Sequence, residues 1–153
     1  MKGSRIMGQN SGAVYALNKH SCLPIEILTA YSASLENKLK AVCPEFVPNF
    51  MSMDFYFKGY TAIFTGYPND ESPFRLTNLN ITSNIYSLYG IKIGDKMEKA
   101  NEILLPHGYA LLTEENSFKT YGSGSIQICL TGNCIISEIN ISVQVLYLGN
   151  RIY

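Results

Sequence analysis

The sequence has no excess of charge of either sign. Its 153 residues contain twelve basic and twelve acidic side chains, which leaves a formal net charge of zero. Proteins that attract nucleic acid or an anionic membrane over long range carry a basic patch or stripe. The balance of charges therefore argues against nucleic acid as a partner, and we predict none.

Long apolar runs are also absent. The longest apolar stretches are interrupted by a Lys, Asn or Ser within a few residues, whereas a spanning helix needs about 20 apolar residues in succession. The first ten residues include Lys2 and Arg5 but lack the continuous apolar segment of a secretory signal. We predict no membrane span. Two compartments stay open: the cytoplasm, for the sequence as written, or the cell exterior or surface, if a signal has been removed.

Recognisable catalytic chemistry is scarce as well. His20 and His107 are isolated in the sequence, and neither belongs to a local signature of a nucleophile with its base. Cys129 and Cys134 have no second Cys or His pair at the spacing that zinc sites use. The glycine-rich stretch 121–125 lacks the lysine and the following helix of a phosphate-binding loop. We therefore predict a non-enzymatic chain without metal or cofactor.

What the sequence does contain is enough apolar material, 46% of residues against 16% charged, to bury the core of one folded domain. Residues 1–23 are predicted to form a tail, with an edge strand at 13–17 as an option. A first helix is predicted because Leu35, Leu39 and Val42 are apolar at helical spacing. Ser32 or Ser34 is its predicted N-cap, and Pro44 its predicted end. A hairpin at residues 54–65 and a third strand at 75–82 follow.

The same succession returns after a linker at residues 83–89. A second helix is predicted to begin after Gly94-Asp95 and to end at Pro106, and one of its sides carries Met97, Ala100, Asn101 and Leu104. Three strands follow at residues 117–121, 125–130 and 134–146, separated by turns that contain glycine.

The two halves can be aligned in order. The matched pairs lie at the helix ends and in one hairpin: Val42 with Leu104, Pro44 with Pro106, and Thr65-Gly66 with Thr131-Gly132. The alignment predicts an α+β fold of two tandem helix-then-antiparallel-strands units, residues 24–84 and 85–153, which form one antiparallel sheet with the helices on one face. The alternative is that any two stretches of this kind look alike when they are forced together.

The strand period of two predicts which side chains the sheet leaves open. In the last strand the buried side holds Ile139, Ile141, Val143 and Val145, and the open side holds Glu138, Asn140, Ser142 and Gln144. Tyrosine is enriched at binding surfaces, although Tyr60 is interpreted as a half-buried strand residue. The predicted binding site, for a protein or ligand, is the open face together with the loop of residues 67–72. Its predicted binding residues are Tyr56, Tyr67, Asn78, Asn80, Glu138, Asn140 and Gln144.

Cys129 and Cys134 bracket Thr131-Gly132, which is typical of a tight turn. A two-residue turn would place the two sulfurs opposite each other on the open face, within reach of a disulfide, and would favour an oxidising compartment. The alternative is two thiols in a reducing cytoplasm, where a redox role of this pair is the second functional hypothesis. Cys22 and Cys43 could pair or be free, and a small enzyme has no motif in its support.

The stretch from Gly90 to Ala100, running into Leu104, resembles the opening of the repeat in the β-lactamase inhibitory protein and outer-membrane assembly lipoprotein (SmpA/OmlA) group. The resemblance implies a tandem α-β architecture and a non-enzymatic binding domain that is usually exported. The sequence departs from the pattern because Ala100 is small, Leu105-Pro106 replaces the helix-ending glycine, and Ser32 replaces Gly94 in the first copy. Inhibition of a β-lactamase is not implied, since it depends on loop residues that cannot be placed here.

Overall fold

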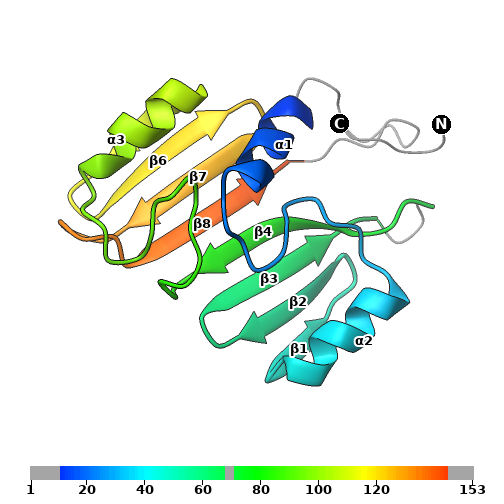
Figure 1. The fold of residues 1–153 in the computed structure, drawn as a ribbon. Helices are drawn as coiled ribbons and strands as arrows, with labels where there is room; N and C mark the ends of the chain where they lie inside the picture. Colours follow the sequence, from blue (N-terminus) through cyan, green and yellow to red (C-terminus); the bar gives the residue numbers. More distant parts are fainter. Residues whose placement is uncertain (1–10, 68–70, 145–153) are drawn as a thin grey trace.

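One antiparallel sheet organises the part of the chain that the computed structural model describes, residues 11–67 and 71–144 (Figure 1). Its eight strands run in the order β1-β2-β3-β4-β8-β7-β6-β5. The bounds are β1 Glu45–Pro48, β2 Ser52–Phe57, β3 Tyr60–Thr65, β4 Arg75–Ile81, β5 Ala110–Glu114, β6 Phe118–Ser123, β7 Ile126–Thr131 and β8 Glu138–Val143. The α+β class and the single antiparallel sheet are therefore confirmed.

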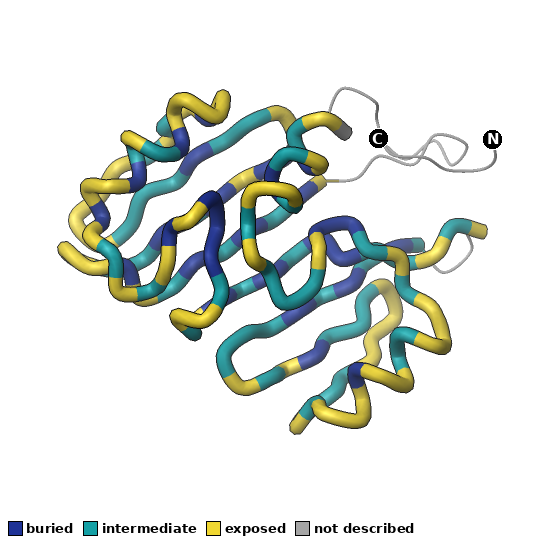
Figure 2. Tube along the Cα trace, in the orientation of Figure 1, coloured by how far each residue is buried: buried dark blue, intermediate teal, exposed yellow. Residues whose placement is uncertain are grey.

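Three helices lie on the same side of this sheet: α1 (Ser11–Lys19), α2 (Ala33–Val42) and α3 (Lys99–Leu104), which continues into the short 3-10 helix η2 (Leu105–His107) (Figure 1). Each buries apolar side chains against the strands, and Figure 2 shows their outer sides exposed. The buried helix residues are Val14 and Leu17 in α1, Leu39 in α2, and Ala100 and Leu104 in α3. None of these helices is long and apolar enough to cross a membrane.

The predicted N-cap of the first helix and the predicted buried side of the second helix are found in the structure. The Ser32 side chain accepts a hydrogen bond from the Leu35 backbone N–H and so caps α2. Met97, Ala100 and Leu104 are buried as one side of the second helical segment, whose α-helical part begins only at Lys99. The α-helix ends at Leu104, and the chain continues as η2, which contains Pro106.

The structure differs from the sequence predictions in three elements: one segment was assigned the wrong type, and two strands were missed. Residues 13–17 form part of helix α1 and not an edge strand, since Val14 and Leu17 lie one helical turn apart and both reach the core. Strands β1 and β5 were not predicted. β1 ends at Pro48 and lies at the edge of the sheet, where proline is tolerated, and β5 contains a register shift between Leu111 and Thr113 that breaks its alternation.

The last strand is shorter than predicted. β8 covers Glu138–Val143, and residues 134–137 belong to the connection that precedes it. The alternation of β8 is as predicted, because Ile139 and Ile141 are buried and Val143 nearly so. Val145 and Leu146 lie outside the described residues. Tyr60 is half-buried in the ring cluster of Phe57 and Tyr86, and burial raises its pKa to about 12.

Candidate binding surface

The side of the sheet that faces away from the three helices is called here the open face. Strand register places its side chains in continuous rows, since directly paired residues of antiparallel strands point to the same side. One row crosses six neighbouring strands and consists of Tyr56, Thr61, Asn80, Asn140, Cys129 and Thr120. Each member is half-buried or exposed, which matches the prediction of an uncovered polar surface.

Three asparagines form the centre of the open face, where β4 and β8 join the two halves of the sheet. The Asn140 side-chain amide donates to Asn78 Oδ1 at 3.3 Å and to Asn80 Oδ1 at 3.2 Å. Among the described residues, no acceptor takes the side-chain amide protons of Asn78 and Asn80. The cluster therefore holds its own geometry and keeps hydrogen-bond donors for a second molecule.

An acidic group lies on the same face in strand β2. Asp54 Oδ2 accepts hydrogen bonds from the Asn49 amide at 3.3 Å and from the Tyr56 hydroxyl at 3.5 Å. Asp54 Oδ1 is buried and has no hydrogen-bond partner among the described residues. The negative charge of Asp54 raises the pKa of Tyr56. This part of the face therefore carries a negative charge, while the unbonded oxygen of the carboxylate is enclosed by the protein.

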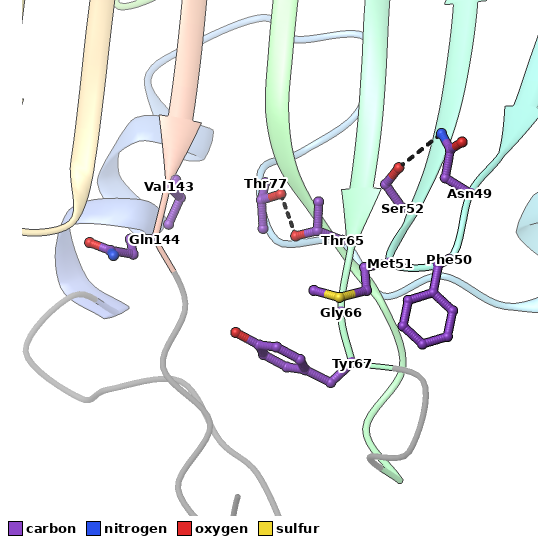
Figure 3. Close-up of a pocket in the computed structure, with 10 residues that line it drawn as sticks. All are labelled: Asn49, Phe50, Met51, Ser52, Thr65, Gly66, Tyr67, Thr77, Val143 and Gln144. Atoms are coloured by element: carbon purple, nitrogen blue, oxygen red, sulfur yellow. Dashed lines mark hydrogen bonds between the residues drawn. The ribbon is translucent and has the colours of Figure 1, made fainter. Parts of the chain in front are cut away.

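A hollow of about 710 Å³ opens at the end of the sheet, and Asn49, which donates a hydrogen bond to Asp54, is among its lining residues (Figure 3). In Figure 3 the Tyr67 ring lies between Gln144 on one side and the Phe50 ring on the other. The turn before β2 supplies two exposed apolar side chains, Phe50 with 77% and Met51 with 42% of its surface accessible. The Thr65 and Thr77 hydroxyls, 2.7 Å apart, line the same hollow. An apolar rim over hydroxyl groups suits an amphipathic side chain of a partner.

The predicted binding residues thus divide into groups on the open face. Asn78, Asn80 and Asn140 meet directly, and Tyr67 and Gln144 line the hollow. Tyr56 is separated from Asn80 by Thr61, and Glu138 lies in the neighbouring position of β8 opposite Thr131. Sequence reasoning missed Asp54, Phe50 and Met51. The exposure of the last two results from the turn between β1 and β2, and β1 itself was not predicted.

The predicted pairing of Cys129 with Cys134 rests on a wrong register. Cys129 lies opposite Asn140 and Thr120, and both thiols are free. Thr131-Gly132 is not a two-residue turn, because residues 132–137 connect the strands and Thr131 pairs with Glu138. Cys134 belongs to this connection, where its carbonyl oxygen accepts a hydrogen bond from the Met97 N–H.

The two histidines are not isolated in space. The ring centroids of His20 and His107 are 5.5 Å apart, and the His107 ring lies 4.3 Å from that of Tyr89. No sequence signal indicated this pair, since the two residues belong to separate helical segments. Within residues 11–67 and 71–144, no group of three or more His, Cys, Asp or Glu side chains is arranged to hold a metal ion.

Comparisons with known proteins give the fold and little else. No protein-family model matches the chain, and no curated protein matches it. A solved structure of an extracellular protein containing a SCP domain from Bacillus anthracis str. Ames is similar over 97% of this chain, with 10% sequence identity and a TM-score of 0.50. The chain spans about half of that protein, 55% of its length, and at this identity the similarity concerns the fold alone.

Proposed function

We propose that this chain is a non-catalytic binding domain that docks a protein partner on its open face. The observation that carries the proposal is the uninterrupted polar row across the sheet, on the face that none of the described helices covers (Figure 1). Eight strands at their usual spacing make a face about 34 Å wide, and strands of about six residues make it about 20 Å deep. That is roughly 700 Å², close to one side of a standard protein interface.

The chemistry of the face favours a protein over a small molecule. The asparagine cluster offers directional donors, and Asp54 adds a negative charge to the face. Phe50, Met51 and Tyr67 add apolar contact at the hollow, where a partner side chain can be anchored. A partner with a basic or amide-rich flat surface and one protruding side chain satisfies all three parts at once.

We also infer that the face is built from two tandem units, residues 24–84 and 85–153. In its support, each half has a helix followed by four antiparallel strands, and the last strands of the two halves pair with each other. The inference agrees with the resemblance to the exported binding domains named above.

Site-directed photo-crosslinking in cells that naturally make the protein tests the binding face. A photoreactive residue at Thr61 or Thr120, both on the open face, is expected to give one discrete crosslinked species. The same residue at Lys38 of α2 or Glu102 of α3, both exposed on the helix side, is the matched control and is expected to give none. Equal crosslinking from both sides contradicts the proposal.

Substitution of the asparagines separates binding from folding. Asn80→Ala and Asn140→Ala are expected to change the free energy of unfolding by about 1 kcal/mol or less, because both side chains are partly exposed and their bonds are long. The same variants are expected to reduce crosslinking at Thr61. Unchanged crosslinking in the double variant is the result that removes the cluster from the binding face.

A further inference from the structure

The two histidines of the chain meet on the helix side, away from the proposed binding face. His20 directly follows α1, and His107 is the last residue of η2. Both side chains are exposed, and their ring centroids are 5.5 Å apart with 40° between the ring planes. Imidazole is the commonest nitrogen ligand of transition metals in proteins. Here two accessible imidazoles lie close enough together to be considered as ligands of one ion.

We propose that His20 and His107 together bind a zinc-class divalent transition-metal ion. An imidazole nitrogen lies about 2.1 Å from Zn²⁺, so each ring centroid lies about 3.2 Å from the ion. At the tetrahedral angle the two centroids are then about 5.2 Å apart, and at the right angle of an octahedral site about 4.5 Å. The observed 5.5 Å is close to the tetrahedral value, so the two rings are near the separation at which both can coordinate one ion.

Contacts with Tyr89 hold together the two segments that carry the histidines before an ion arrives. The His107 ring packs on Tyr89, whose own ring is buried and whose hydroxyl is 3.2 Å from that of Tyr109. The Tyr89 backbone N–H donates to the hydroxyl of Ser21, the neighbour of His20, at 2.9 Å. Tyr89 has a φ of +52°, an uncommon value for a tyrosine. The two histidine-bearing segments are thus tied to the same residue, which lowers the entropy lost on chelation.

The site supplies two protein ligands. Within the described residues no third His, Cys, Asp or Glu side chain completes a metal-binding group with them. Two coordination positions are therefore left for water or for a group from another molecule, as in an open rather than a closed structural site. The expected affinity is that of a two-imidazole chelate, at least about tenfold tighter than a lone surface histidine because the second bond is intramolecular.

Calorimetric titration of the full chain with Zn²⁺ tests the site. His20→Ala and His107→Ala are each expected to weaken binding at least about tenfold, and the double variant to weaken it no further than either single one. Zn²⁺ is also expected to raise the melting temperature of the parent protein and of neither variant, because the ion bridges α1 to η2. Single variants that keep the parent affinity overturn the proposal.

Two controls separate this site from unspecific metal binding. His20→Ala combined with Asn37→His keeps two histidines but puts the second on the exposed surface of α2, so it is expected not to restore binding. Cys22→Ser with Cys134→Ser removes the two exposed thiols and is expected to leave the affinity unchanged. Restored binding in the first control, or a thiolate charge-transfer band in the Co²⁺ spectrum of the parent protein, overturns the assignment to the histidine pair.

Discussion

The two halves of the sheet, strands β1 to β4 and strands β5 to β8, differ in the side chains that fill their cores. In the first half, Phe55 is surrounded by rings, with centroids at 4.5 Å for Phe46, 5.9 Å for Phe64 and 6.2 Å for Tyr31. In the second half the corresponding layer is mainly aliphatic, with one buried ring, that of Tyr121, beside Ile126, Ile128, Leu130, Ile139 and Ile141. Aromatic and aliphatic side chains can therefore fill the core beneath the same sheet. The alternation of apolar and polar residues and the turns define the strands, whereas the core requires only side chains of matched volume.

The comparison is sharpest at the two glycines that the sequence alignment pairs, Gly66 and Gly132. Gly132 has a φ of +143°, and a Cβ there would lie 2.0 Å from the backbone oxygen of Ile135. Gly132→Ala is therefore expected to cost about 4 kcal/mol of unfolding free energy, since backbone must move. A Cβ at Gly66 would instead meet the side-chain ring of Phe74 at 2.4 Å, and Gly66→Ala is expected to cost about 1 to 3 kcal/mol.

Urea denaturation of both alanine variants measures this difference. The added variant Gly66→Ala with Phe74→Leu is expected to recover part of the first-half cost, because only a side chain obstructs the new methyl group. Equal costs at the two glycines would show that the two hairpin ends are constrained alike.

A smaller difference in the cost of substitution is expected at Phe55 in β2 and Tyr121 in β6, two aromatic residues at the same position of their strands. Phe55 and Tyr121 are each the fourth residue of a six-residue strand and are fully buried. The Tyr121 hydroxyl donates to Asn101 of α3, whereas Phe55 packs against the rings of Phe46 and Phe64 and pairs across the strands with Ala62. Phe55→Tyr is expected to cost about 2 to 3 kcal/mol, because it buries a hydroxyl without a partner.

The reciprocal change, Tyr121→Phe, is expected to cost about 1 kcal/mol, the net value of one side-chain hydrogen bond. Thermal unfolding of both variants against the parent protein gives the two values. If Phe55→Tyr is tolerated without loss, the first-half core contains a polar group able to receive the hydroxyl, and its description as a purely aromatic cluster is wrong.

These differences also show which features a sequence can reveal. The Ser32 cap and the alternation of Ile139 and Ile141 depend on neighbours within a few residues, and both were predicted. The Cys129 register was not, because the length of the β7–β8 connection is fixed by hydrogen bonds such as that from the Ser137 N–H to the Thr131 carbonyl. The meeting of His20 with His107 depends on how α1 packs beside η2, which no local pattern encodes.

The sequence predicted which polar residues lie on the open face of the candidate binding site, but it did not predict the hollow. Asn78, Asn80 and Asn140 follow from the period of two once the strands are placed. Thr77 lines the hollow because β4 carries an extra residue opposite Ile63 and Phe64, and a bulge of this kind interrupts the alternation from which faces are predicted.

The smallest expected effect concerns how each half anchors its helix to the rest of the domain. In the second half the anchor is neutral, Tyr121 to Asn101. In the first half the Tyr31 hydroxyl donates to the carboxylate of Glu36 in α2, and Lys40 pairs with the same carboxylate at 2.9 Å. The hydrogen bond from Tyr31, followed by that from Lys40, lowers the pKa of Glu36 below its ordinary value of 4.5. Only the first-half anchor is therefore expected to depend on pH.

The sign of that dependence follows from linkage between protonation and folding. Because the pKa of Glu36 is lower in the folded state, its stabilisation is present above pH 4.5 and is lost as the pH falls through the folded pKa. Tyr31→Phe is expected to cost about 1 kcal/mol at neutral pH and less at pH 3, because the contribution of the Glu36 carboxylate to folding declines once the pH falls below 4.5. Tyr121→Phe is the matched control, with the same cost at both pH values because Asn101 does not titrate. Urea unfolding at the two pH values measures all four numbers, and a Tyr31→Phe cost that stays constant would show that the Glu36 carboxylate does not contribute to anchoring α2.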